Sequence, residues 1–160
     1  MNPPRILVVD DDSSLRWVLK TQLEEMGYAV DTAASGAEAL AAMDKRPPAL
    51  VLTDLKMPGM SGMELLEHIR RDYPEIPVLI ITAFGTIQSA VEAMRRGVYD
   101  YLTKPIDYDE LGLVVSRVLD HFRLVREVQT LRASLDRKYG FENIIGHSEA
   151  LLSLLDTAAR

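Results

Sequence analysis

The sequence predicts an α/β fold, a doubly wound parallel sheet of five strands, and two observations support this prediction. Short aliphatic runs alternate along the chain with longer segments of helical period. Strict alternation of this kind implies right-handed crossovers between parallel strands. The runs are also unbroken, as expected for strands that helices cover on both faces.

Five segments are the candidate strands. Ile6–Val9, Leu50–Leu52 and Val78–Ile81 are continuous aliphatic stretches, typical of central strands. Tyr28–Ala33 and Tyr99–Leu102 are weaker candidates that suit the edges of a sheet. The arrangement we expect is the flavodoxin-like strand order 2-1-3-4-5.

The segments between the strands carry start and stop signals of helices. Three pairs have the spacing of a capping box, in which side chains satisfy free backbone donors: Ser35 with Glu38, Ser61 with Glu64, and Asp107 with Glu110. Gly27 and Gly97 lie where helices should end. The helices are therefore expected to fill the intervals between the strands.

Composition favours a soluble globular protein. Of the 160 residues, 48% are hydrophobic and 26% charged, near the averages of globular domains. No apolar run is long enough to span a bilayer, and the start of the chain lacks the apolar segment of a secretion signal. Cysteine is absent, which excludes disulfides and thiolate metal sites, and we expect a cytoplasmic protein. The net charge of −6 argues against nucleic-acid binding by these residues.

Polar residues follow four of the five predicted strands. Asp10–Asp12 come after the first strand, Asp54 after the third, Thr82 after the fourth, and Lys104 with Pro105 after the fifth. Because sites in such sheets form beyond the carboxyl ends of the strands, we expect these side chains to converge.

A cluster of carboxylates at this edge requires a cation. Two carboxylates about 4 Å apart repel by about 4 kcal/mol at an effective dielectric constant of about 20. The candidate ligands are all oxygens, so the expected ion is Mg²⁺, which accepts one or two carboxylates, waters and a phosphate oxygen. A carboxylate beside that ion can attack a phosphoryl group and form an aspartyl phosphate. Thr82 and Lys104 would then hold the phosphoryl oxygens.

Four motifs resemble the receiver domains (CheY-like) of bacterial two-component response regulators: Ile6–Asp12, Leu52–Gly62, Ile81–Ala83 and Tyr101–Pro105. The resemblance covers about residues 5 to 122, and the motifs stand in order at the usual spacing. It implies that Asp54 accepts a phosphoryl group from a sensor histidine kinase. The role it implies is regulatory, and we do not expect an enzyme.

The resemblance also implies a set of metal ligands. Asp11 and Asp54 would bind Mg²⁺ directly, and Asp10 would bind it through a water molecule. The backbone carbonyl of Lys56 would complete the protein ligands. No further cofactor is expected.

Two residues would form the switch that the resemblance implies. Thr82 would bind the phosphoryl group and move together with Tyr101, whose ring would turn inward when the site is occupied. Lys104 would pair with the phosphoryl oxygens, and its peptide bond to Pro105 is expected to be cis.

The fourth helix and fifth strand would form the face that moves. An apolar stripe lies along that helix, at Ile87, Ala90, Val91 and Met94. Packing against the sheet is the ordinary interpretation of such a stripe, and contact with a partner is the other.

A long helix is predicted from Asp107, with no stop signal before Gly140. Leu124, Val128, Leu131 and Leu135 recur at alternating intervals of four and three, the seam spacing of a coiled coil. We therefore expect a receiver domain at residues 1–122 and a helical linker at residues 123–140. The linker would form a homodimer by coiled-coil pairing, or serve as a plain amphipathic helix, because about two heptads are too few to decide.

The last stretch, residues 141–160, looks like the entry to the AAA+ ATPase domain of NtrC-type, sigma-54-dependent activators. It contains Phe141–Ser148 and then an apolar helical pattern; His147 is interpreted as a cap or loop residue. The phosphate-loop motif of an ATPase is absent, so we expect no ATP hydrolysis. By resemblance, a longer parent protein would assemble an ATPase ring, act on sigma-54 RNA polymerase and bind DNA, and the end at Arg160 would be a deliberate truncation.

Three other functions were weighed against this one. A pseudo-receiver would share the fold without phosphorylation, but the acids, threonine and lysine are intact. A haloacid-dehalogenase-like phosphatase would use Asp10 as its nucleophile in a D-x-D motif with Asp12, but Ser14 stands where that motif has threonine or valine. A flavin carrier would need a phosphate-binding loop where the three aspartates stand, and they would repel a phosphate.

Overall fold

The computed structural model describes residues 2–83 and 85–142. The predicted AAA+ entry lies outside this part of the chain from residue 143 onward, and so does His147. The chain divides into two compact units, one ending at Leu119 and the second beginning at Asp120.

Five strands and five helices alternate along the described residues. They are β1 (Arg5–Val9), α1 (Ser13–Glu25), β2 (Ala29–Ala33), α2 (Gly36–Lys45), β3 (Leu50–Thr53), α3 (Gly62–Asp72), β4 (Val78–Thr82), α4 (Ile87–Arg95), β5 (Asp100–Thr103) and α5 (Tyr108–Glu142). All neighbouring strands pair in parallel, in the order β2-β1-β3-β4-β5. The predicted fold class and strand order are confirmed.

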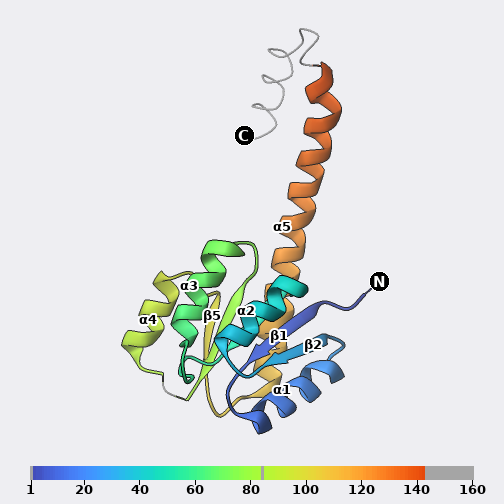
Figure 1. Cartoon of the computed structure of the whole chain (residues 1–160). Helices are drawn as coiled ribbons and strands as arrows, with labels where there is room; N and C mark the ends of the chain where they lie inside the picture. The colour runs from blue at the N-terminus through green and yellow to red at the C-terminus, as the bar shows by residue number, and fades with distance from the viewer. Residues whose placement is uncertain (1, 84, 143–160) are drawn as a thin grey trace. The chain divides into compact units, whose positions relative to one another are not determined.

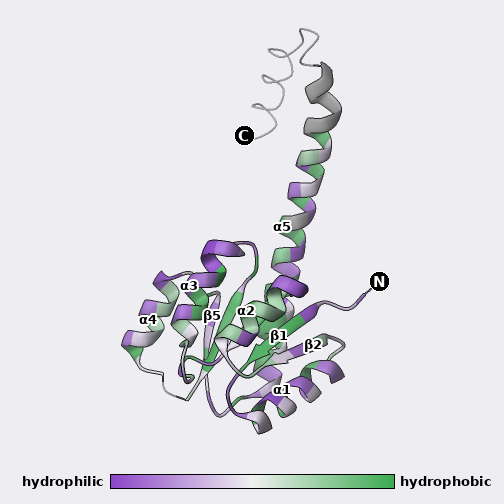
Figure 2. Ribbon diagram, viewed as in Figure 1, coloured by the Kyte–Doolittle hydropathy of each residue, from purple (hydrophilic) through white to green (hydrophobic). Residues whose placement is uncertain are grey.

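The core lies between the sheet and the helices on its two faces (Figure 1). Side chains of one face, among them Leu7, Val51 and Ile80, pack in a single buried cluster with residues of α2 and α3. The alternate residues of the same strands point to the opposite face, where Leu23 of α1 and Val115 of α5 are fully buried. Figure 2 shows the central strands as the most hydrophobic part of the first unit.

Two helices end as their glycines predicted. Gly27 and Gly97 have positive φ angles of 100° and 95°. After α1, the N–H groups of Gly27 and Tyr28 donate back to the last turn of the helix, and the same pattern follows α4. This is the Schellman arrangement, in which a left-handed residue lets the chain cap its own free carbonyls.

The helix starts were predicted in part. Ser35 and Ser61 accept hydrogen bonds from the N–H groups of Glu38 and Glu64, and the Asp107 carboxylate accepts from Glu110. The capping box that is complete on both sides belongs to α4, where Thr86 and Ser89 cap each other. Its third residue is serine rather than Glu or Gln, so the sequence pattern did not reveal it.

The apolar stripe of α4 does not pack against the sheet. Ile87, Val91 and Met94 are 87%, 47% and 53% exposed. Ala93 is the residue of α4 that is buried. The interpretation of most of the stripe as core was therefore wrong, because a small residue on the adjacent row makes the contact with the sheet.

The long helix is confirmed: α5 runs from Tyr108 to Glu142 and continues through Gly140. The four predicted seam residues are among its exposed apolar side chains: Leu124, Val128, Leu131 and Leu135. No helix in the described residues combines the length and the apolar character that crossing a membrane requires.

Candidate functional site

The sheet places the predicted site residues just beyond its strands. The N–H of Asp10 donates to the carbonyl of Ala33 in the neighbouring strand β2, at 3.2 Å. In the same way the N–H of Asp54 donates to Val9, and the N–H of Lys104 donates to Thr82, each at 3.0 Å. The ladder thus continues one residue past β1, β3 and β5, and it fixes the backbone from which these side chains project.

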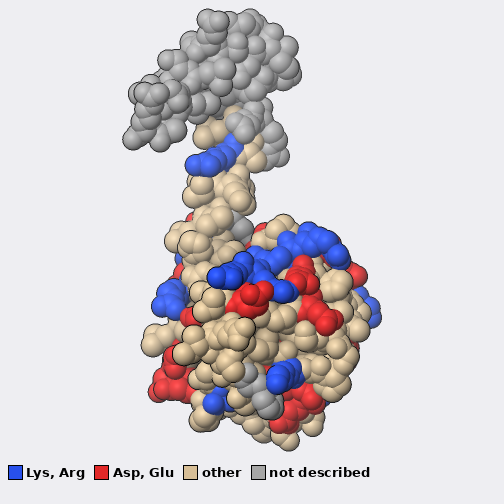
Figure 3. Space-filling view, turned by 90° about the vertical axis from the view of Figure 1, so that its left-hand side faces the viewer, with Lys and Arg blue, Asp and Glu red and all other residues tan. Residues whose placement is uncertain are grey.

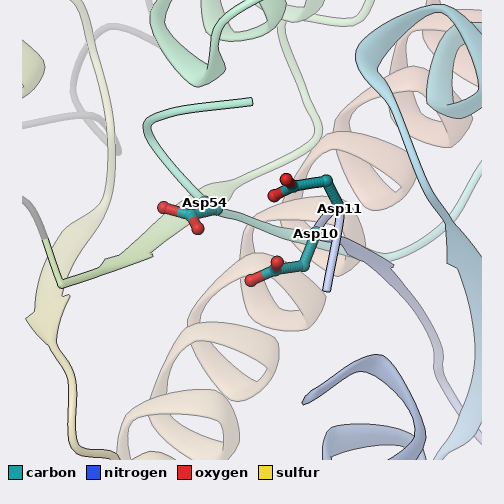
Figure 4. A group of neighbouring side chains, drawn as sticks. All are labelled: Asp10, Asp11 and Asp54. Atoms are coloured by element: carbon teal, nitrogen blue, oxygen red, sulfur yellow. The ribbon is translucent and has the colours of Figure 1, made fainter. Parts of the chain in front are cut away.

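Three aspartates meet at this edge (Figure 4). Asp10 and Asp11 project from the end of β1, and Asp54 from the end of β3, with one carboxylate oxygen of each within 4.8 Å of the others. Asp10 and Asp54 are buried, whereas Asp11 is exposed to solvent. The prediction that these acids converge is borne out by the geometry.

Lys104 joins the two buried acids. Its ammonium nitrogen Nζ lies 3.1 Å from Oδ2 of Asp10 and 3.0 Å from Oδ2 of Asp54. The lysine reaches them from the loop after β5, and its peptide bond to Pro105 is cis, as the resemblance implies. One cation therefore faces a cluster of acids whose charge it does not balance.

The electrostatics of the cluster show in its pKa values. Burial raises the pKa of the Asp10 carboxyl, and this effect outweighs the hydrogen bond from the Asp12 N–H and the attraction of Lys104, which lower it. Burial alone would lower the pKa of Lys104, but its hydrogen bonds and charge interactions with Asp54 and Asp10 together raise it. The ammonium therefore stays charged, and an ionised Asp10 lacks full compensation.

These residues fit a hard divalent cation. The donors are carboxylate oxygens, which Mg²⁺ prefers, and they lie close enough together to share one ion. Burial raises the pKa of the Asp10 carboxyl, and a cation bound nearby would favour its ionised form. Lys56 follows Asp54 by two residues in the adjoining loop, with its side chain exposed.

Gly62 was missed by the sequence reasoning, although it shapes the site. A Cβ atom at this position would overlap the carbonyl oxygen of Asp54 and lie 2.8 Å from the Cα of Leu55. The loop after β3 thus folds back so that α3 starts against the backbone of Asp54. The Leu55 N–H donates to Oδ1 of Asp54 at 2.6 Å, which orients the carboxylate.

Thr82 and Tyr101 differ in how far they are buried. Thr82 is fully buried at the end of β4. Tyr101, in β5, is half-buried, and its hydroxyl lies 3.0 Å from Oγ of Ser89 in α4. A Cβ on Gly85 would come within 2.8 Å of that hydroxyl, so the ring packs closely over the loop before α4. In this arrangement Tyr101 is attached to α4.

Asp12 caps a helix and does not join the cluster. Its carboxylate accepts hydrogen bonds from the N–H groups of Ser14 and Leu15, and so caps α1. Among the three consecutive aspartates, Asp10 and Asp11 belong to the cluster and Asp12 belongs to the helix.

Charges of both signs mix on the face that carries α3 and α4 (Figure 3). Arg96, at the end of α4, forms ion pairs with Glu67 of α3 and Glu92 of α4, and the first of these pairs links the two helices. These pairs occupy the Arg96 guanidinium with local acids. This face is therefore not the continuous basic surface that binding to nucleic acid requires.

A family model described as the response regulator receiver domain matches residues 6–116. The chain belongs to this family. The match begins in β1 and ends in α5, so all the site residues of this receiver domain lie within it.

Curated relatives of the receiver domain are transcriptional regulators. The chain is 43% identical over 118 residues to the DNA-binding transcriptional regulator NtrC of Escherichia coli (strain K12), covering 74% of this chain and 25% of NtrC. It is 34% identical over 156 residues to the regulatory protein AtoC of the same organism, covering 98% of this chain and 34% of AtoC. The chain thus spans about a quarter to a third of the length of these relatives.

A solved structure is similar as well. The crystal structure of NtrX from Brucella abortus in complex with ADP has a TM-score of 0.75 and 41% identity, covering 81% of this chain and 29% of that chain. Receiver domains are regulatory modules, which agrees with the role expected from the motifs.

Proposed function

We propose that Asp54 accepts a phosphoryl group from a sensor histidine kinase in the presence of Mg²⁺. The observation that supports this most is the ammonium of Lys104, shared between Asp54 and Asp10 beside a third carboxylate. Such a site holds a nucleophile, positive charge for the incoming phosphoryl oxygens and oxygen ligands for a metal.

The transfer needs little more than positioning and charge. An oxygen of Asp54 forms a bond to phosphorus while the bond between phosphorus and the donor breaks, and the bonding electrons leave with the donor. Lys104 moves its hydrogen bond from the Asp54 carboxylate to a phosphoryl oxygen. The Leu55 N–H, 2.6 Å from Oδ1, holds the carboxylate in place as the attack proceeds.

Four groups would hold the metal. Asp11 and Asp54 would bind it through carboxylate oxygens, Lys56 through its backbone carbonyl, and Asp10 through a water molecule. When bound, Mg²⁺ supplies the positive charge that neutralises the phosphoryl oxygens. The raised pKa of Asp10 supports this assignment, since the buried carboxylate gains most from added positive charge.

The signal would leave the site through Thr82 and Tyr101. A phosphoryl group on Asp54 adds strong acceptor oxygens, and the Thr82 hydroxyl moves to donate to one of them. Space opens for the Tyr101 ring to turn inward, which breaks its hydrogen bond to Ser89 and frees the first turn of α4. The exposed stripe at Ile87, Val91 and Met94 is the surface that this change would alter.

The relatives support a larger role for the parent protein. We infer a bacterial, cytoplasmic NtrC-type activator in which residues 1–122 are the receiver and 123–140 a dimerising linker. Residues 141–160 would begin an AAA+ domain that forms a ring, acts on sigma-54 RNA polymerase and is carried to DNA by a separate domain. The alignment with AtoC over 156 residues, well beyond the receiver, supports this interpretation.

Intact-mass analysis tests the phosphoacceptor directly. The protein is incubated with acetyl phosphate, with and without Mg²⁺, beside the variants Asp54→Asn and Asp10→Asn. We expect one phosphoryl adduct on the wild type, strongly reduced without Mg²⁺ and absent from Asp54→Asn.

Two outcomes would contradict the proposal. No adduct on the folded wild type would indicate a pseudo-receiver, which acts by contact alone. An adduct that survives Asp54→Asn and disappears in Asp10→Asn would indicate that Asp10 is the nucleophile, as in haloacid-dehalogenase-like phosphatases.

A further inference from the structure

We propose that Arg16 is a positioning residue for the metal site: its side chain holds the carbonyl of Asp10, in the peptide group that precedes Asp11, and so aims the carboxylate of Asp11. The inference rests on the proposed function, because it assumes that Asp11 is a Mg²⁺ ligand. Nothing in the strand-end pattern pointed to Arg16, which lies in the first turn of α1.

Arg16 makes two contacts with the loop after β1. Its side-chain Nη1 donates to the carbonyl of Asp10 at 2.6 Å, and its backbone N–H donates to the carbonyl of Asp12 at 3.0 Å. The second bond is the first i→i−4 hydrogen bond of α1 and does not depend on the side chain. These carbonyls belong to the residues before and after Asp11. The Arg16 side chain therefore fixes the peptide group between Asp10 and Asp11. The peptide group after Asp11 is held by the Asp12 N–H, which donates to Oδ1 of Asp10 at 2.9 Å.

Asp11 depends on this backbone support more than its neighbours do. Asp10 is tied by its carboxylate to Lys104 and to the N–H of Asp12. Asp54 is tied to Lys104 and to the N–H of Leu55. Asp11 is exposed, and within the described part of the chain its carboxylate makes no hydrogen bond or ion pair. Its direction is therefore set by the main chain alone.

The location of Arg16 is unusual for a cation. The first turn of a helix carries partial positive charge, which favours acidic rather than basic side chains. Helical side chains lean toward the N-terminus, so an arginine here can reach back to the end of the preceding strand. A residue that opposes the helix dipole and yet lies half-buried against the site is best explained by its contact with the Asp10 carbonyl.

The sign of the effect separates positioning from charge. Arg16→Met removes a cation near the acids, so by Coulomb attraction alone the site should bind Mg²⁺ more tightly. If Arg16 instead aims Asp11, the same variant should bind Mg²⁺ more weakly. We expect a loss of about tenfold, because residues that orient metal ligands affect affinity on this scale.

The experiment is isothermal titration of Mg²⁺ into the full 160-residue chain as wild type, Arg16→Met, Arg16→Lys and Arg5→Met. Arg5 is the matched control, since it is partly buried on the opposite end of β1 and pairs with Asp31. We expect Arg5→Met to bind as the wild type does. Arg16→Lys, which keeps a donor and the charge, should fall between the wild type and Arg16→Met.

Two further readouts separate positioning from folding. Without Mg²⁺, the melting temperature of Arg16→Met should fall no further than that of Arg5→Met. Its phosphorylation rate with acetyl phosphate should return to the wild-type value at saturating Mg²⁺. Equal or tighter Mg²⁺ binding by Arg16→Met, or a melting temperature well below that of Arg5→Met, would overturn the inference. A wild type that binds no Mg²⁺ would instead overturn the proposed function.

Discussion

Asp10 shows how a single residue can be unfavourable for the apo fold and useful for the site. Its carboxylate is buried at 3% exposure, and that burial raises its pKa. A carboxyl whose pKa is raised by folding binds its proton more tightly in the folded state. Stability therefore falls as the pH rises from the unfolded-state pKa, about 3.9, through the folded-state value, and the full penalty remains at neutral pH.

Asp10→Asn should therefore stabilise the protein without Mg²⁺ at neutral pH. Asparagine keeps an acceptor for the Asp12 N–H and removes the uncompensated charge. We expect the melting temperature to rise at pH 7, the gain to shrink as the pH falls through the folded-state pKa, and the stabilisation by Mg²⁺ to decrease. Differential scanning calorimetry with and without Mg²⁺ measures all three.

Asp12→Asn is the control for this experiment. It removes the same charge from an exposed position two residues further along, and asparagine caps a helix as well as aspartate does. A gain in melting temperature that is equal in both variants would show that net charge, rather than burial of Asp10, is responsible.

At the residue scale, the sequence predicted the site residues that directly follow a strand. Asp10, Asp54 and Lys104 follow hydrophobic runs, so their meeting depends on the topology alone. Gly62 and Arg16 could not be found this way. Their roles depend on the path of a loop and on the reach of a side chain, which the local sequence pattern does not encode.

At the scale of elements, β5 and α4 are joined through one hydroxyl group. Ser89 accepts from the Thr86 N–H at 2.9 Å, and its Oγ also lies 3.0 Å from both the Thr86 carbonyl and the Tyr101 hydroxyl. The start of α4 is thereby linked to the position of the half-buried Tyr101 ring. The helix has one buried residue, Ala93, so little else of its own packing holds it.

Tyr101→Phe should loosen the first turn of α4. Losing one partly buried hydrogen bond costs about 0.5–1.5 kcal/mol, and we expect faster amide exchange at Ser89–Val91 with β4 unchanged. Ser89→Ala should have a larger effect, because it also removes the half of the capping box in which the Thr86 N–H donates to Ser89. Hydrogen exchange followed by NMR resolves these amides.

Tyr73→Phe supplies the comparison for this pair of variants. It also deletes a phenolic hydroxyl, one that hydrogen-bonds Asp44 between α2 and the end of α3. If exchange in α4 accelerates as much in Tyr73→Phe as in Tyr101→Phe, the link through Ser89 is not what holds the helix.

The sequence predicted the kind and order of these elements better than their surfaces. Glycines at positive φ and serine caps have local causes, so Gly27, Gly97, Ser35 and Ser61 could be identified from the chain alone. Which side of α4 faces the sheet depends on how closely the helix can approach, and Ala93 allows an approach that the larger stripe residues do not.

At the scale of the whole molecule, the exposed apolar side chains of α5 bear on whether the protein forms a dimer. Leu124 and Leu131 are 55% and 64% exposed, and with Val128 and Leu135 they form a seam at coiled-coil spacing. Exposed apolar residues in a row at this spacing are expected to pair with a second copy of the same helix.

Leu131→Lys should weaken that pairing. A lysine in the seam must be buried or displaced, whereas Thr130→Lys places the same side chain beside the seam and does not lower the helix propensity. We expect the wild type and Thr130→Lys to elute as dimers in size-exclusion light scattering and Leu131→Lys to shift toward the monomer. Identical masses for all three proteins would reject pairing through this seam.

The convergence of distant strand ends on one cluster has a consequence for the life of the protein. Asp10, Asp54 and Lys104 are separated by up to 94 positions along the chain, and they come together only when the complete sheet has formed. A nascent or partly unfolded polypeptide lacks the assembled acceptor site. It should therefore not be phosphorylated even where the phosphoryl donor and Mg²⁺ are abundant. The fraction of molecules that can be phosphorylated should therefore equal the fraction that is folded. Unfolded copies of the receiver would then contribute no signal.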